Sequence, residues 1–432
     1  MFRTFILVCS FIIPLTVIAQ ENAGRAVSDT SYKGVVFETS VSSWAEIVSK
    51  ARASNKLIFI DCYATWCVPC KVMDKTVYPE KEAGDYFNSK FFCVKLQMDS
   101  TKNDAENIRQ SRSVADFIAN RYKVDAYPTL LFFDSEGRLV NRFEGGMLPR
   151  GLIDFAKSSF DPQKDYYKML AQYESGNYTI GDLDFLAMRS LTLGDTTKSM
   201  EISQKYILTV TEKKIPSKED LLFCSRFTTT PEEIGFLYFI HHRKEINDIM
   251  TDTTYSQDVV SNILFKNFVQ PELQKCETAE NIVPDWQKVA RQIRTKYGKY
   301  YADRVVLHGK ISWFAYKKEW NSWAKYYVEY FDDYTNMEIS GHWVAYAFNN
   351  AAWSVFQHTD DRDALKKALS WSAKAVLMEP ASNWMDTYAN LLYKLNETSV
   401  AIQWEKLAVL GEPKNKAFAV NLKKMEDMQP TW

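Results

Sequence analysis

The feature that most constrains this chain is a pair of cysteines two residues apart, in the segment Trp66-Cys67-Val68-Pro69-Cys70. An apolar run at residues 57–60 precedes the pair and predicts a buried strand, and residues 71–77 predict a helix after it. Two cysteines at this spacing can close a small disulfide and open it again. Because the N-terminus of a helix carries partial positive charge that stabilises a thiolate, the pattern predicts a nucleophilic cysteine at neutral pH.

A zinc site and a purely structural disulfide are the alternatives to redox chemistry at this pair. Zinc would need a second pair of Cys or His residues at ligand spacing. The five histidines do not cluster with cysteines, and the remaining cysteines stand singly in the sequence: Cys9, Cys62, Cys93, Cys224 and Cys276. We therefore predict a redox-active disulfide between Cys67 and Cys70, with no metal and no cofactor.

Length and composition indicate more than one globular domain. A chain of 432 residues exceeds one ordinary domain, and 46% hydrophobic residues supply enough apolar surface for a substantial core. The formal net charge of -1 gives no reason to expect nucleic acid as a partner. Ten of the twelve tryptophans lie at or beyond Trp286, so the C-terminal part is built differently from the part that holds the cysteine pair.

The N-terminus has the pattern of an export signal. Arg3 is followed by an apolar stretch at residues 5–17, and Val17-Ile18-Ala19 provides small side chains before a cleavage point. We predict a signal peptide at residues 1–19, a tether at residues 20–33 and an exported, periplasmic protein. An uncleaved membrane anchor is the alternative, although the apolar stretch is short for a span of about 20 residues. In an oxidising compartment, a single close cysteine pair favours a working disulfide over a structural one.

Residues 34–160 alternate between strand-like and helix-like patterns. The expected strands are residues 35–37, 57–63, 91–96, 129–133 and 139–143. The expected helices are residues 44–51 (capped by Ser43), 71–77, 114–122 and 150–158, and the polar residues 100–113 are expected to form a surface insertion. Asp134-Ser135-Glu136-Gly137 separates the last two strands and predicts a hairpin. This order predicts an α/β sheet with an antiparallel hairpin at one edge.

Within this pattern, several residues resemble the thioredoxin family. The matching features are Asp61 six positions before the first cysteine, Trp66-Cys67-x-Pro69-Cys70-Lys71, Lys95-Leu96 followed by Asp99, and Tyr127-Pro128-Thr129. The run from Cys70 to Val77 is similar to the exported branch that includes periplasmic thiol-disulfide interchange domains. The resemblance covers roughly residues 35–158 and implies a thioredoxin fold for residues 34–160.

The resemblance implies a role for each cysteine and for its flanking residues. Cys67, at an exposed helix start, would attack a disulfide in a partner, and the more enclosed Cys70 would resolve the mixed disulfide. Val68 and Pro69 would tune the stability of the thiolate. The Trp66-Cys67-x-Pro69-Cys70 pattern is typical of reducing members, so the resemblance favours a reductase.

Four supporting residues are also implied by the resemblance. Asp61 would be a buried acid of raised pKa that takes a proton from Cys70, with Lys95 as its partner. Pro128 would be a cis-proline facing the cysteine pair, and Tyr127 would offer backbone hydrogen bonds to a peptide. The alternatives are a solvated aspartate at a strand end, an exposed strand lysine and an ordinary trans proline.

Two further cysteines lie in the predicted strands. The side chain of Cys62 is expected on the sheet face opposite Asp61, because side chains alternate along a strand. Cys62 and Cys93 are both expected to be buried as small apolar side chains. A disulfide between them across neighbouring strands is conceivable but not favoured.

From residue 161 the pattern is helical, and near the end it contains an internal repeat. The run that begins at Trp371 and ends at Pro380 recurs from Trp404 to Pro413, an offset of 33 residues. This spacing resembles a degenerate tetratricopeptide array at residues 346–432, preceded by an α-helical region at residues 161–345. An irregular helical domain with a chance repeat is the alternative. The expected fold class is therefore an α/β thioredoxin fold followed by an all-α, helical-repeat region.

Together these patterns imply an exported thiol-disulfide oxidoreductase. Its expected partners are a client protein that contains a disulfide and an upstream thiol that donates electrons, and the helical region is expected to bind the client. The alternative is a non-catalytic scaffold, in which the helices bind partners and the thioredoxin-like domain serves only for docking.

Overall fold

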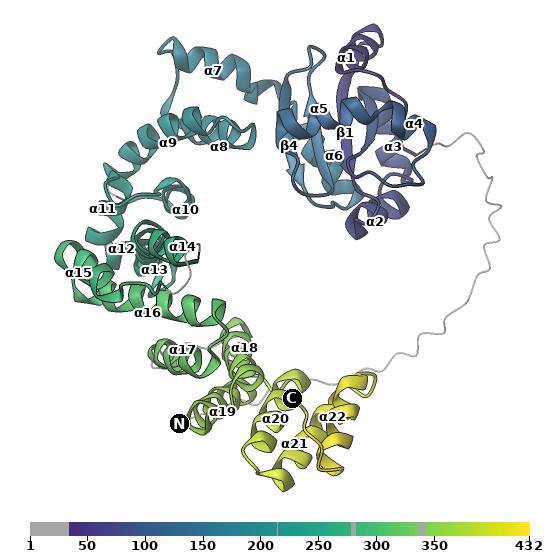
Figure 1. Ribbon diagram of the computed structural model, residues 1–432. Helices are drawn as coiled ribbons and strands as arrows, with labels where there is room; N and C mark the ends of the chain where they lie inside the picture. Colours follow the sequence, from purple (N-terminus) through teal and green to yellow (C-terminus); the bar gives the residue numbers. More distant parts are fainter. Residues whose placement is uncertain (1–33, 214, 278–281, 336–341) are drawn as a thin grey trace, which may run out of the picture. The chain divides into compact units, whose positions relative to one another are not determined.

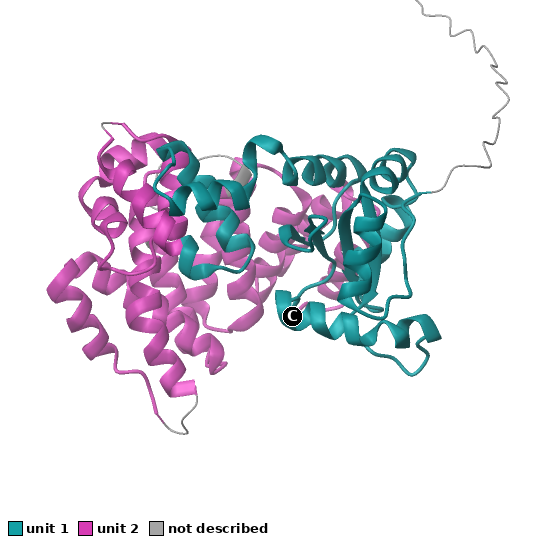
Figure 2. Ribbon diagram, turned by 90° about the horizontal axis from the view of Figure 1, so that it is seen from above, with its two compact units in different colours: residues 1–199 teal, residues 200–432 magenta. Residues whose placement is uncertain are grey.

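The computed structural model describes residues 34–213, 215–277, 282–335 and 342–432, and these residues form two compact units divided between residues 199 and 200 (Figure 2). The predicted signal peptide at residues 1–19 and the tether at residues 20–33 lie outside the described residues. Within the described part, no helix is both long and apolar enough to cross a membrane.

The first unit is built on a four-stranded sheet with the order β2-β1-β3-β4. The strands are β1 (Leu57–Tyr63), β2 (Phe91–Gln97), β3 (Thr129–Phe133) and β4 (Leu139–Glu144). β1 pairs with β2 in parallel, and the pairs β1–β3 and β3–β4 are antiparallel. The predicted sheet and its edge hairpin are therefore confirmed, and Gly137 adopts a positive φ of 80° in the hairpin turn.

The strand expected at residues 35–37 is absent, and this prediction was wrong. The N–H of Val35 donates to the carbonyl of Tyr78 at 2.8 Å and not to a neighbouring strand. Only Glu38 reaches the sheet, where it forms a single bridge with Val94. The apolar pattern of residues 35–37 reflects packing of Val35 and Phe37 against one face of the sheet.

Helices cover both faces of the sheet (Figure 1). The helices of this part are α1 (Trp44–Ala53), α2 (Val68–Thr76), α3 (Lys81–Lys90), α4 (Glu106–Gln110), α5 (Arg112–Tyr122) and α6 (Pro149–Ser159). Side chains of α1 and α5 pack on one face of the sheet, and those of α2, α3 and α6 pack on the other. As predicted, Ser43 caps α1, because its hydroxyl accepts a hydrogen bond from the N–H of Glu46.

The first helices after the sheet remain part of the first unit. They are η1 (Pro162–Lys164), α7 (Tyr166–Glu174), η2 (Ile180–Asp182) and α8 (Leu183–Thr192). The hydroxyl of Tyr167 donates to the carbonyl of Leu139 at 2.9 Å, and the guanidinium of Arg189 donates to the carbonyl of Val140 at 2.7 Å. Both carbonyls belong to β4, the edge strand, so α7 and α8 are fastened to the sheet. The compact unit thus extends past residue 160, where the sheet domain was predicted to end.

The rest of the described chain is helical. Its helices are α9 (Thr196–Thr211), α10 (Lys218–Phe227), α11 (Ile234–His241), α12 (Arg243–Met250), α13 (Tyr255–Leu264), the π-helix η3 (Phe265–Val269), α14 (Gln270–Glu277), α15 (Trp286–Tyr297), α16 (Lys299–Tyr316), α17 (Trp320–Thr335), α18 (His342–His358), α19 (Arg362–Met378), α20 (Ser382–Lys394), α21 (Thr398–Gly411) and α22 (Lys416–Glu426). A thioredoxin-like domain followed by an all-helical region is therefore the observed fold class.

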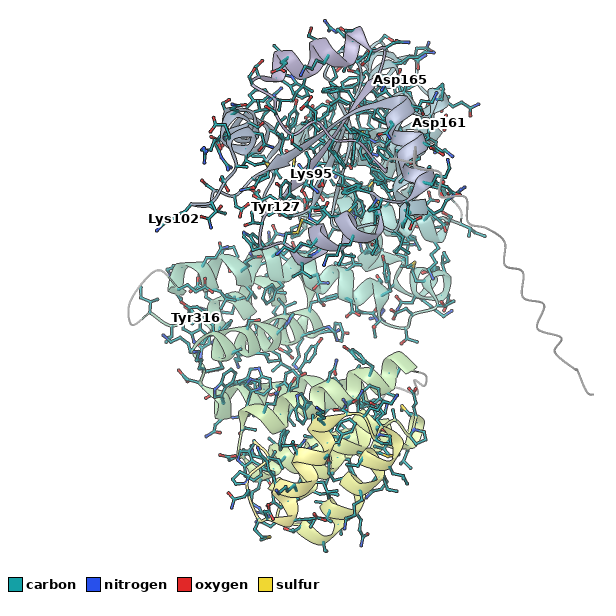
Figure 3. All side chains as sticks on the ribbon, turned by 90° about the vertical axis from the view of Figure 1, so that its right-hand side faces the viewer. Lys95, Lys102, Tyr127, Asp161, Asp165 and Tyr316 are labelled. Atoms are coloured by element: carbon teal, nitrogen blue, oxygen red, sulfur yellow. A yellow bond between two sulfur atoms is a disulfide. The ribbon has the colours of Figure 1, made fainter. Side chains whose placement is uncertain are left out.

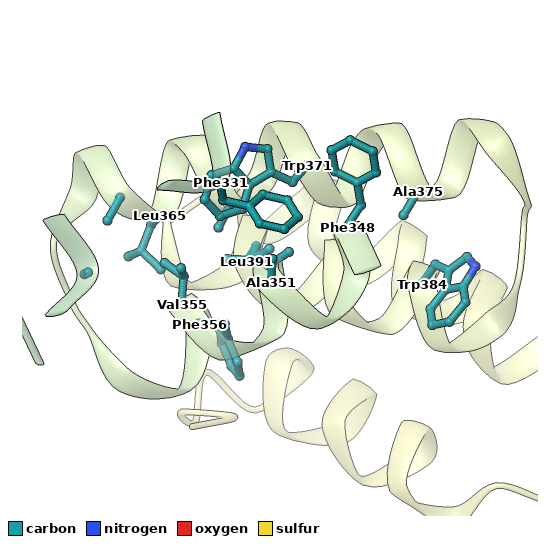
Figure 4. Close-up of a cluster of buried hydrophobic side chains, with 14 of the residues drawn as sticks. Phe331, Phe348, Ala351, Val355, Phe356, Leu365, Trp371, Ala375, Trp384 and Leu391 are labelled. Atoms are coloured by element: carbon teal, nitrogen blue, oxygen red, sulfur yellow. The ribbon is translucent and has the colours of Figure 1, made fainter. Parts of the chain in front are cut away.

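The two copies of the sequence repeat lie on α19 and α21. Each of these helices packs most closely on the helix before it, α18 or α20. Trp371 is buried in a large apolar cluster (Figure 4), and Ala375 and the equivalent Ala408 are fully buried. The small side chains therefore occur where paired helices touch, and a tetratricopeptide-like array stays a prediction.

Candidate functional site

The cysteine pair lies at the N-terminus of α2, as the sequence predicted. Cys67 and Cys70 form a disulfide, with their Cα atoms 5.4 Å apart. Cys67 is the N-cap of α2, and its Sγ accepts a hydrogen bond from the N–H of Cys70 at 3.1 Å. Pro69 occupies the first turn, where a proline costs no helical hydrogen bond. The first sulfur therefore lies where helix N–H groups can stabilise negative charge.

The expected difference in exposure between the two cysteines is not observed. Both Cys67 and Cys70 are only 2% exposed, so the prediction of an exposed Cys67 was wrong. In the disulfide the two sulfurs share one small cluster with Ala64, and Tyr63 and Tyr127 pack against it. The exposed surface is provided by the neighbouring Trp66 and Val68, whose exposed fractions are both 67%.

Tyr127 packs against the two cysteines, and Pro128 follows it in the chain. The peptide bond between them is cis, and the carbonyl of Pro128 accepts a hydrogen bond from the N–H of Gly145 at 2.7 Å. The ring of Tyr127 meets the indole of Trp66 edge to face, with 5.7 Å between the ring centroids. The segment before β3 and the loop before α2 therefore contact each other at the cysteine pair.

Asp61 and Lys95 face each other on β1 and β2. The two residues are direct partners in the strand register, and the Nζ of Lys95 lies 3.6 Å from an Oδ of Asp61. Asp61 is 1% exposed, and its burial raises the pKa of its carboxyl to about 6, although the nearby Lys95 opposes this shift. A carboxyl with such a pKa is mostly ionised at pH 7 and still binds a proton readily.

The surroundings of Lys95 contain residues that the sequence analysis did not assign to the site. The ammonium group of Lys95 also pairs with Asp74 on α2, and it lies 5.0–5.6 Å from the ring centroids of Phe37, Tyr63 and Tyr78. Lys95 is labelled together with Tyr127 in Figure 3. Asp74 follows Cys70 by one helical turn, and this i+4 spacing was the available signal for its place near the site.

Cys62 and Cys93 are buried on opposite faces of the sheet. Cys62 packs with the α1 and α5 side, whereas Cys93 packs with the α2, α3 and α6 side. In the strand register Cys93 lies opposite Phe59, three residues from Cys62. A disulfide between them is therefore excluded, and both are free thiols whose pKa values are raised by burial.

Among the described residues, no group of three or more His, Cys, Asp or Glu side chains is arranged to hold a metal ion. In the helical unit, Cys224 and Cys276 are buried free thiols. Among the cysteines that the structure describes, the pair at α2 is the one that forms a disulfide.

A thioredoxin-like fold with a disulfide at the start of α2 defines the class of this domain, and comparison with known proteins agrees. Residues 44–157 match the family described as a thioredoxin-like domain. Thioredoxin-1 of Drosophila melanogaster is 34% identical over 89 residues, which are 21% of this chain and 67% of that protein. The chain belongs to the thioredoxin family.

Two further similar proteins have names that refer to disulfide exchange. The thiol:disulfide interchange protein DsbD of Pseudoalteromonas atlantica is 26% identical over 145 residues, which are 33% of this chain and 23% of that protein. A solved structure of a Bacteroides thetaiotaomicron protein, described as a proposed disulphide-isomerase, is 32% identical and has a TM-score of 0.25. The match covers 30% of this chain and 97% of that one. This chain spans less than a quarter of the interchange protein's length.

Proposed function

We propose that the protein is an exported thiol-disulfide oxidoreductase that reduces disulfides in client proteins through Cys67 and Cys70. The observation that carries this proposal is the disulfide at the N-terminus of α2, a helix whose Asp74 shares the ammonium group of Lys95 with the buried carboxyl of Asp61. A structural disulfide would not need a proton acceptor on the neighbouring strand. The names of the similar proteins support the same class of reaction.

In the reduced protein, the thiolate of Cys67 attacks one sulfur of a client disulfide. A bond forms between Cys67 and that sulfur, the client disulfide breaks, and the other client sulfur leaves as a thiolate. Asp61 takes the proton from the thiol of Cys70, and the resulting thiolate attacks the sulfur of Cys67. The second client thiolate leaves, so the client gains two electrons and the Cys67–Cys70 disulfide forms.

The remaining site residues are assigned supporting roles. Trp66 offers an exposed indole for the client, Pro69 fixes the first turn of α2, and Lys95 balances the charge of Asp61. Tyr127, which packs against the cysteine pair, and the following Pro128 would offer their backbone to the client chain. An upstream thiol must reduce the disulfide again after each cycle, because the step above leaves both cysteines oxidised.

The location and the direction of electron flow rest on the sequence. The signal pattern at residues 1–19 supports export to the periplasm, and the Trp-Cys-x-Pro-Cys motif supports reduction over oxidation. We assign residues 34–160 to the catalytic domain, residues 161–345 to a helical region and residues 346–432 to tetratricopeptide-like repeats. In this proposal the helical part holds the client, as helical repeat arrays commonly do.

Turnover of a model disulfide protein, with a small dithiol as electron source, tests the proposed activity. The wild-type chain should accelerate reduction, and Cys67→Ser should abolish the acceleration. Cys62→Ser and Cys93→Ser are the matched controls, because both thiols are buried and unpaired. If Cys67→Ser kept full activity, the proposed chemistry would be wrong.

A further inference from the structure

Thr65, two residues before Cys67, is fastened to the end of β2. The N–H of Thr65 donates to one carboxylate oxygen of Asp99 at 2.9 Å, and its hydroxyl donates to the other oxygen. In the same turn, the N–H of Cys67 donates to the carbonyl of Ala64 at 3.1 Å. Asp99 is therefore bound to the turn that leads into Cys67.

Asp99 is in turn held by Gln97, the last residue of β2. The side-chain amide of Gln97 donates to the carbonyl of Asp99 at 3.0 Å and to the carboxylate of Asp104 at 2.8 Å. The hydroxyl of Tyr63 donates to the side-chain oxygen of Gln97 at 3.3 Å. Gln97 is 7% exposed, so this link between the ends of β1 and β2 is sheltered from water.

Asp104 is the centre of this network, and it belongs to the polar segment that the sequence identified as an insertion. Its carboxylate accepts hydrogen bonds from Gln97, from the N–H and hydroxyl of Thr101 at 3.1 and 2.6 Å, and from Arg112 at 3.0 Å. These bonds, that of the Thr101 hydroxyl first, lower the pKa of Asp104 to about 2. The side chain of Asp104 is only 6% exposed.

Arg112 connects Asp104 to the backbone of β2. One guanidinium nitrogen of Arg112 pairs with Asp104, and another donates to the carbonyls of Gln97 and Met98 at 3.1 and 3.4 Å. The arginine is the first residue of α5, so the inserted segment is fixed at both of its ends. Lys102, labelled in Figure 3, is an exposed residue of the same insertion.

We propose that Asp104 and Arg112 are positioning residues for the cysteine pair, which act through Gln97 and Asp99 on the turn that holds Cys67. This inference rests on the proposed function. A thiolate at a helix start is stabilised only while the helix N–H groups point at it, and the bond from Cys70 to the Cys67 sulfur depends on the turn before it. A looser turn would give a less stable thiolate and a more stable disulfide.

The test compares Asp104→Asn and Arg112→Lys with wild type in the full-length mature chain. A lysine at position 112 keeps a positive charge near Asp104, but it lacks the planar guanidinium that binds the carbonyls of Gln97 and Met98. Arg112→Lys is therefore the milder substitution, for use if Asp104→Asn folds poorly. In both variants the Cys67 thiolate should titrate at higher pH, and attack on a small disulfide at pH 7 should slow by roughly two- to fivefold. The equilibrium with glutathione should shift toward the Cys67–Cys70 disulfide.

Glu106→Gln is the matched control, because Glu106 pairs with Arg109 in the same insertion and both side chains are mostly exposed. It should change neither the thiolate titration nor the glutathione equilibrium. Thr65→Val removes the hydroxyl bond to Asp99 and keeps the bond from the N–H of residue 65, and its effect should not add to that of Asp104→Asn.

A lower melting temperature with an unchanged thiolate titration and an unchanged glutathione equilibrium would overturn the proposal, because the network would then be only structural. So would additive effects of the Thr65 and Asp104 substitutions. The thiolate titration and the glutathione equilibrium both report on the cysteine pair and do not require a protein client. A wild-type chain that failed to reduce protein disulfides would therefore contradict the proposed function and leave this test intact.

Discussion

At the scale of single residues, Asp61 shows how two opposing effects set a pKa. Removal from water favours the neutral carboxyl, and the nearby ammonium of Lys95 favours the ionised one. The burial effect is larger, which leaves the pKa at about 6. Lys95 also pairs with Asp74, so its positive charge does not stabilise the Asp61 carboxylate alone.

The raised pKa predicts how stability depends on pH. The folded state binds the Asp61 proton more tightly than the unfolded state, so this group stabilises the fold below its unfolded pKa, and the contribution is lost as pH rises through about 6. Relative to wild type, Asp61→Asn should therefore gain about 3 kcal/mol of unfolding free energy between about pH 3.5 and pH 7. Denaturant unfolding of the oxidised protein at several pH values measures this. If the unfolding free energies of wild type and Asp61→Asn changed with pH in the same way, the prediction would be contradicted. Asp85→Asn is the control, because Asp85 forms an exposed ion pair with Lys81.

Substitution of Asp61 should also affect the two chemical steps differently. Its proposed role is removal of the proton from Cys70, so Asp61→Asn should slow resolution of the mixed disulfide about tenfold or more at pH 7 while the first attack changes little. Rapid-mixing kinetics with a small disulfide distinguishes the steps. Equal slowing of both steps, or of neither, would make Asp61 a structural residue.

Sequence reasoning at this scale worked where a residue type is tied to a position in a motif. The spacing of Cys67 and Cys70 placed the cysteine pair, and the resemblance to thioredoxins implied Asp61 and Lys95. The strand register explains why these last two residues face each other. The equal burial of the two cysteines was not predictable, because it depends on side chains such as Tyr127 that arrive from a distant segment.

At the scale of elements, the edge of the sheet is protected by chain that follows the predicted domain. An edge strand presents unpaired backbone groups, and α7 and α8 satisfy two of them on β4 with the side chains of Tyr167 and Arg189. The guanidinium of Arg138 stacks on the ring of Tyr167 with 4.5 Å between guanidinium carbon and ring centroid. The sequence predicted that residues 161–345 are helical but not this contact, because tertiary hydrogen bonds to backbone carbonyls leave no periodic signal.

Arg189→Met tests whether this attachment stabilises the first unit. The methionine keeps much of the apolar stem but leaves the carbonyl of Val140 without its donor, so the full-length chain should lose about 2 kcal/mol of unfolding free energy. Chemical denaturation followed by circular dichroism measures the loss. Arg150→Met is the control, because Arg150 is exposed and pairs only with the exposed Asp154 among the described side chains. Equal effects of the two substitutions would show that the contact to β4 contributes nothing specific.

At the scale of the whole molecule, truncation tests whether the first unit carries the redox activity and the helices bind the client. A chain ending at residue 199 keeps the compact first unit, whereas one ending at residue 160 removes α7 and α8. We expect the longer fragment to reduce small disulfides as fast as the full chain, and the shorter one to melt several degrees lower.

The same comparison tests the role of the helices. If they hold the client, they raise the effective concentration of its disulfide near Cys67, and the fragment ending at residue 199 should reduce the natural client more slowly than the full chain. Equal rates would contradict client binding by the helical region. The pattern at residues 346–432 predicted helices there, and the equivalent Ala375 and Ala408 are both buried, but neither spacing nor composition identifies the client.

Capture of mixed disulfides is the most direct test of the central claim that Cys67 attacks client disulfides and Cys70 resolves them. Cys70→Ser, expressed with its export signal in the native host, should accumulate covalent complexes that a thiol reductant releases. Cys67→Ser should accumulate none, since the attacking sulfur is gone. If neither variant trapped a partner, or if both trapped the same ones, the dithiol would not be the reacting group. A partner-binding scaffold with a docking domain would then describe the protein better.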